Sequence, residues 1–146
     1  MLLDFSQNGF YIVFEIEEER KVYLRHFSTQ EKEYERKNPK NPRSCRIVDI
    51  HVAGEDVDDH HGYKHTGASR SNTLKYVTHR YFESALGNKL EFDLADETIA
   101  LTVHYQFYRN IRVVRSWCVV TNTGCESLGL EYVTSFAYAG LKAELQ

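Results

Sequence analysis

Hydrophobic and polar side chains alternate strictly along residues 99–107, and this is the strongest pattern in the chain. The apolar positions are Ile99, Leu101, Val103, Tyr105 and Phe107, with Thr102, His104 and Gln106 between them. Because successive side chains of a strand point to opposite faces, the alternation predicts a strand with one buried face.

Two more long strands are predicted downstream of this one. Residues 111–121 form a run rich in valine, and larger apolar residues alternate with smaller or polar ones along residues 128–138. The sequence Asn122-Thr123-Gly124 between them is typical of a turn. We therefore expect the three strands to form an antiparallel meander.

The chain upstream of residue 95 contains five shorter strand candidates. They are residues 10–16 and 21–27, which form a hairpin around the charged residues 17–20, then 46–52, and a pair at 74–81 and 89–94 connected through Gly87-Asn88. About eight strands at short, regular spacing predict an all-β antiparallel sandwich. The charged residues 28–44 fit a loop or one exposed helical turn, and residues 54–72 do not fit a strand either.

Composition supports this fold class and restricts the function. The 146 residues include 10 Tyr, 8 Phe and 1 Trp, and aromatic residues favour strands. The net charge of -3 excludes a generally basic surface for nucleic acid. The chain is too short for a complete TIM barrel of about 250 residues, so we expect a single domain over residues 1–146.

The sequence also indicates where the protein works. It contains no apolar run of ~18–20 residues, and its first residues lack the basic and apolar regions of a signal peptide. The three cysteines, Cys45, Cys118 and Cys125, are widely spaced and odd in number, which is typical of reduced thiols. We therefore predict a cytoplasmic protein with no membrane partner.

Acidic and histidine side chains are concentrated in residues 54–72. The densest part contains Asp59, His60, His61, Tyr63, Lys64 and His65. Imidazole and carboxylate groups suit zinc and related ions, but adjacent residues of an extended loop point in different directions, and no metal-binding spacing is present. The residues alone leave three alternatives open: a metal site, a loop that binds a ligand or another subunit, and a solvated loop with no special task. No metal and no cofactor is assigned.

The rest of the sequence offers few catalytic candidates. His79 and His104 lie in strand patterns, where histidine is usually a hydrogen-bonded structural residue, and Cys118 lies in an apolar strand. Neither a Gly-x-Ser-x-Gly elbow nor a Gly-rich phosphate loop is present. Pairing of His79 or His104 with Glu131 is the only general acid–base pair that we can propose. The tyrosines fit core packing better than sugar stacking.

Three stretches in the second half resemble glycoside hydrolase family 36 α-galactosidases. Residues 74–80, L-K-Y-V-T-H-R, resemble the L-Y-V-S-H strand of that family's N-terminal domain. Residues 113–124, V-V-R-S-W-C-V-V-T-N-T-G, resemble its I-x-R-S-x-x-I-x-N-x-G hairpin, and residues 128–136 resemble its L-x-L-E-x-x-x-S strand. The order and spacing of these motifs agree over about residues 54–141.

The resemblance implies a fold, an activity and a role for this chain. The implied fold is an antiparallel β-supersandwich similar to galactose mutarotase, placed before a catalytic TIM barrel. The implied activity of the full-length protein is hydrolysis of terminal α-galactosides with retention. In that family the nucleophile and the acid/base are aspartates of the barrel, so no residue of this chain receives a catalytic role. The chain would support the barrel and the assembly of a homo-oligomer.

The same resemblance gives the loop from Asp59 to His65 a substrate-binding role. In tetrameric members a loop of this domain approaches the active site of a neighbouring subunit, where it would meet a galactoside. Many members carry G-D-Y-R at this place, whereas this chain has Lys64, which supplies a point charge without the bidentate fork of arginine. Two alternatives are a stand-alone carbohydrate-binding module and a mutarotase-like sugar enzyme.

Overall fold

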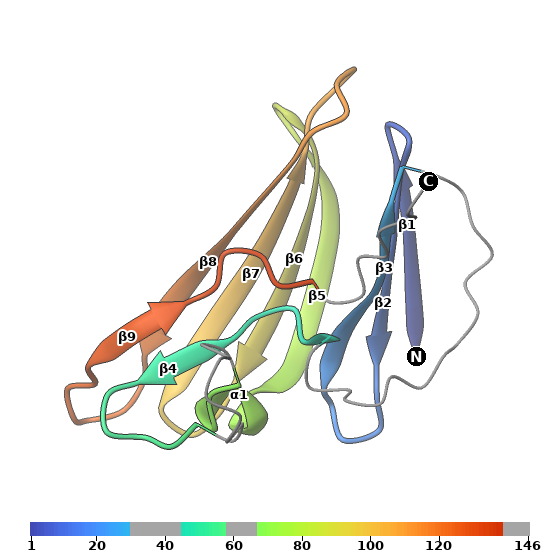
Figure 1. Ribbon diagram of the computed structural model, residues 1–146. Helices are drawn as coiled ribbons and strands as arrows, with labels where there is room; N and C mark the ends of the chain where they lie inside the picture. The colour runs from blue at the N-terminus through green and yellow to red at the C-terminus, as the bar shows by residue number, and fades with distance from the viewer. Residues whose placement is uncertain (30–44, 58–66, 139–146) are drawn as a thin grey trace, which may run out of the picture.

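The computed structural model describes residues 1–29, 45–57 and 67–138, which form nine strands and one short helix. Figure 1 shows two larger sheets facing each other. The first contains β1 (Leu2–Gln7), β2 (Phe10–Ile16) and β3 (Val22–Ser28), in that order, with every pairing antiparallel. Asn8 and Gly9 both have positive φ, as the tight turn between β1 and β2 requires.

The second large sheet is a four-stranded antiparallel meander. Its strands are β5 (Lys75–Ser84), β6 (Gly87–Ala95), β7 (Ile99–Phe107) and β8 (Val114–Asn122). A small third sheet pairs β4 (Ile50–Val52) with β9 (Leu130–Val133), and helix α1 (Arg70–Thr73) precedes β5. The predicted all-β antiparallel sandwich is therefore confirmed.

The core lies between the two large sheets. Phe14 of β2 packs against Phe92 of β6 and Tyr105 of β7, with ring centroids 4.7 and 5.3 Å apart, and none of the three side chains is exposed. Ile50 and Val52 of β4 belong to the same buried cluster. The small sheet therefore extends the core of the two large sheets.

The sequence patterns located some strands correctly. The predicted strands at residues 10–16 and 99–107 have the bounds of β2 and β7. The pair predicted as short is longer than expected, because β5 has 10 residues and β6 has 9. The sequence reasoning missed β1, whose side chains alternate between exposed and half-buried.

The predicted meander at the C-terminal end is wrong in its last pairing. β8 pairs with β7, but β9 pairs with β4, and only residues 130–133 of the expected 128–138 form a strand. Asn122 accepts a hydrogen bond from the amide of Gly124 and donates one to the carbonyl of Glu126, which curls the chain after β8. Two bonds between Asp49 and Thr134 then fix β9 beside β4.

The stretch predicted as a strand at residues 46–52 is also mostly irregular. Only its last three residues form β4, and Arg46 makes an isolated bridge to Tyr23. Residues 30–44, which we expected to form a loop or a helical turn, lie outside the described residues, as do residues 58–66.

Replacing Gly87 with alanine is expected to destabilise the fold. Gly87 has a φ of +139°, and an added Cβ would lie against the carbonyl oxygen of Phe107 and 3.0 Å from the amide of Arg109. We expect Gly87→Ala to lower the free energy of unfolding by about 3–4 kcal/mol, measured by urea denaturation. Gly54→Ala is the matched control, since Gly54 has a φ of +83° but open space around it. It should cost only about 1–2 kcal/mol, and equal losses would contradict the steric explanation.

Candidate functional site

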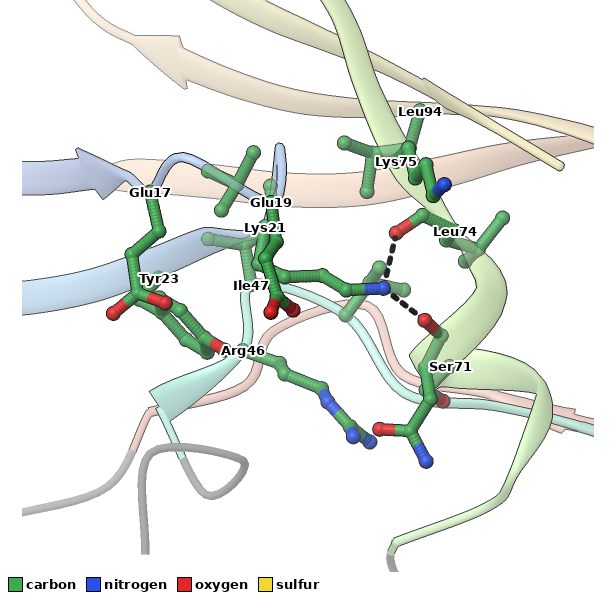
Figure 2. Close-up of a pocket in the computed structure, with 13 residues that line it drawn as sticks. Glu17, Glu19, Lys21, Tyr23, Arg46, Ile47, Ser71, Leu74, Lys75 and Leu94 are labelled. Carbon is green, nitrogen blue, oxygen red and sulfur yellow. Dashed lines mark hydrogen bonds between the residues drawn. The ribbon is translucent and has the colours of Figure 1, made fainter. Parts of the chain in front are cut away.

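A groove of about 750 Å³ lies where the β2–β3 turn approaches α1 and the start of β5 (Figure 2). Its apolar lining consists of buried side chains, namely Val22, Ile47, Val48, Leu74 and Leu94. Charged and polar residues of its lining include Glu17, Glu19, Lys21, Tyr23, Arg46 and Lys75. A groove with an apolar floor and a few polar groups is the usual form of a small-molecule site.

Lys21 connects the two sides of this groove. Its ammonium group donates hydrogen bonds to the carbonyl oxygens of Asn72 and Leu74 at the end of α1, as the dashed lines in Figure 2 show. Burial lowers the pKa of Lys21, and the positive charges of Arg46 and Lys75 lower it further, against the opposing effect of Glu19. The groove therefore collects three cations in a chain with a net charge of -3.

Asp49 organises the segments beside the groove. Its side chain is 6% exposed and accepts hydrogen bonds from the amide of Gly67 at 2.8 Å, from the hydroxyl of Tyr132 at 2.9 Å and from Ser71. Burial and the bond to Asp49 raise the pKa of Tyr132 to about 12. Arg46 adds a longer ion pair of 3.9 Å. One carboxylate thus joins α1, β9 and the chain before β4.

The site predicted from the sequence lies outside the described residues. It consists of Asp59, His60, His61, Tyr63, Lys64 and His65. The chain on either side of them is described. Val57 and Ala68 form an antiparallel bridge, and the amide of Ser69 donates to the carbonyl of Asp56 at 3.0 Å. Gly67 binds Asp49, whose partner Ser71 lines the groove. The two ends of the predicted binding segment are therefore held together close to the groove.

A second polar cluster lies on the face of the four-stranded sheet that points away from the core. Glu91 is its centre: its carboxylate accepts hydrogen bonds from Arg80 at 3.0 Å and from Nδ1 of His104 at 3.0 Å, and it pairs with Lys89 at 2.7 Å. Arg80 also bonds Asp93 at 2.6 Å. Because a carboxylate only accepts, Nδ1 of His104 carries the proton.

The electrostatics of this cluster fix its charge states. Burial raises the pKa of Glu91, but the hydrogen bonds from Lys89 and Arg80 outweigh this effect and bring the pKa to about 2. Burial lowers the pKa of His104, and the charge of Lys89 lowers it further, although Glu91 opposes both. At neutral pH, Glu91 is therefore ionised and His104 is neutral.

Trp117 covers this cluster on its β8 side. It lies directly opposite His104 across β7 and β8, and the two rings stack with centroids 4.7 Å apart and planes 16° apart. Lys89 and Arg115 lie 5.0 and 5.2 Å from the centroid of the indole ring. This stacking explains why His104 is only 9% exposed at an outward-facing position.

His79, His104 and Glu131, which we proposed as an acid–base pair, each have a different partner. Nδ1 of His79 lies 2.8 Å from the hydroxyl of Tyr76, and Glu131 lies 3.1 Å from Nδ1 of His51. His104 contacts Glu91, as described above. His79 and His104 are both hydrogen-bonded, in line with the structural role that we predicted for strand histidines.

The described residues contain neither a cluster that could hold a metal ion nor a helix that could span a membrane. No three His, Cys, Asp or Glu side chains in residues 1–29, 45–57 and 67–138 converge on a position for a metal ion. The one helix described, α1, is far too short to cross a bilayer.

The sequence analysis predicted neither the three cations of the groove nor the cluster around Glu91. Lys21, Arg46 and Lys75 are distant in sequence and carry no motif, so only the tertiary contacts gather them. The cluster around Glu91 had a usable signal, since Arg80, Glu91 and His104 alternate with apolar residues in three predicted strands. With the register of the strands known, they become cross-strand neighbours.

Comparisons with known proteins found no relative. No protein family, no curated protein and no solved structure matches this chain.

Replacing Glu91 with glutamine tests the charge cluster. The pKa of Glu91 falls from 4.5 in the unfolded chain to about 2 in the folded protein, so its stabilisation is present above pH 4.5 and is lost as the pH falls towards 2. We expect Glu91→Gln to lower the free energy of unfolding by about 1–3 kcal/mol at pH 7, measured by urea denaturation. The free energies of unfolding of the wild type and the variant should become equal near pH 2.

Glu83→Gln is the control for this experiment. Glu83 forms an exposed ion pair with Arg109, and its loss should cost less than about 0.5 kcal/mol. A stability gap between the wild type and Glu91→Gln that stays constant from pH 7 to pH 2.5 would contradict the assigned charge state.

Proposed function

We propose that this chain is the N-terminal, non-catalytic β-sandwich domain of an α-galactosidase that resembles glycoside hydrolase family 36. The observation that carries the proposal is the sequence of three motifs in the family's order. In this fold the motif stretches fall on β5, on β8 and on the segment that contains β9. The full-length protein would hydrolyse terminal α-galactosides with retention, and this domain would support its catalytic barrel and its assembly.

Two carboxylates with lowered pKa values, Glu91 and Asp96, support a non-catalytic role. Retaining glycosidases need two carboxyl groups about 5–5.5 Å apart, one of them with a raised pKa so that it acts as an acid at neutral pH. The pKa of Glu91 is instead lowered to about 2, and that of Asp96 is lowered by bonds from Thr73, from two backbone amides and from Arg70 despite burial. Both groups are held ionised by cations or by hydrogen bonds, which suits a structural role.

The glycosidase role is tested first on the chain by itself. The purified chain should not hydrolyse p-nitrophenyl α-galactoside, and measurable turnover that follows the protein through purification would contradict the proposal. Isothermal titration calorimetry with galactose and melibiose tests the alternative of a stand-alone carbohydrate-binding module. Saturable binding by the isolated chain would favour that alternative.

The supporting role is tested by complementation. The catalytic barrel of a family 36 α-galactosidase, expressed without its own N-terminal domain, is titrated with this chain. We expect bound chain to stabilise the barrel by mass action and to raise its α-galactosidase activity at least about tenfold. A barrel whose activity and soluble yield do not respond would contradict the supporting role.

A further inference from the structure

Three turns meet at one end of the sandwich, at the top of Figure 1. They are the β1–β2 turn at Asn8 and Gly9, the β5–β6 turn at Ala85 and Leu86, and the β7–β8 connection from Tyr108 to Val113. We call these three segments the turn rim.

Hydrogen bonds hold the turn rim in one arrangement. The side-chain amide of Asn8 donates to the carbonyl of Tyr108, which joins the first turn to the third. The backbone amide of Arg109 donates to the carbonyl of Leu86 at 3.0 Å, which joins the third turn to the second. Gly87 allows this close approach, since it lies against the backbone of Phe107. The rim is therefore ordered before any partner binds, which lowers the entropic cost of association.

The turn rim exposes large apolar side chains. Leu86 is 56% exposed, Ile111 51% and Val113 49%. Exposed apolar side chains gathered on one part of a surface, bordered by polar residues, mark an interaction site.

The charges of the rim indicate the chemistry of the partner. Arg109 forms an ion pair with Glu83, and Arg112 lies against Gly9. Two arginines against one glutamate leave the rim positive. In a symmetric contact between two copies of this chain, positive rims would face each other, and this disfavours a homodimer. Glu83 and the absence of tryptophan from the three turns disfavour an anionic bilayer.

We propose that the turn rim is the surface through which this domain binds another folded protein domain, one whose contact face is apolar and carries carboxylates. This inference rests on the proposed function, under which that partner is the catalytic barrel. Leu86 and Ile111 are the apolar anchors of the contact, and Arg112 pairs with a carboxylate of the partner.

The test adds rim variants to the titration of the barrel with the full 146-residue chain. Leu86→Asp with Ile111→Asp should weaken binding to the barrel at least about tenfold, because it places carboxylates in an apolar contact that already faces carboxylates. Arg112→Glu should also weaken binding and should reduce its dependence on salt. Leu2→Asp is the matched control: Leu2 is 50% exposed at the start of β1, the end of that strand remote from the rim, and its substitution should change binding less than twofold.

Each outcome decides between the two proposals. If the wild-type chain does not bind the barrel, both the proposed function and the rim inference are overturned. If the wild type and the Leu86→Asp, Ile111→Asp variant bind equally, only the rim inference is overturned. If sedimentation instead shows self-association that this variant abolishes, the rim joins two copies and the inference is wrong. Urea denaturation of every variant separates lost binding from lost folding.

Discussion

The aromatic contact between the two large sheets is the constraint on which the rest of the structure depends. Phe14 reaches across from β2 to meet Phe92 and Tyr105, and burial of three large rings contributes several kcal/mol to folding. This contact buries one face of each large sheet in the core. Charged side chains of the four-stranded sheet must then gather on its outer face, and this is where Glu91, Arg80 and His104 form their cluster.

How far the sequence predicted the fold depended on the length of each pattern. β7 was predicted with correct bounds because nine residues alternate without interruption. The pairing of β4 with β9 was not predictable, since both strands are short and Asp49 and Thr134, which fix it, are 85 residues apart. The local sequence does not predict such a pairing, because it depends on tertiary hydrogen bonds of polar side chains such as Asp49.

The candidate sites also depend on contacts between residues that are distant in sequence, which local patterns do not predict. His104 was predicted to be a structural residue from its position in a strand, but its partners depend on the register of three strands. The three cations of the groove were not predicted at all, because the β2–β3 turn and α1 are distant in sequence and lie side by side only in the folded chain. The burial and the charges that shift the pKa of Lys21 arise from that packing.

The long separation between β4 and β9 also orders events during synthesis. A ribosome adding about 5–20 residues per second needs roughly 4–17 s to extend the chain from Asp49 to Thr134. Once Asn122 has been added, the two large sheets have all their strands, while Ile50 and Val52 still lack their strand partner. These two residues of the buried cluster therefore gain their backbone partner only after residues 130–133 have been added.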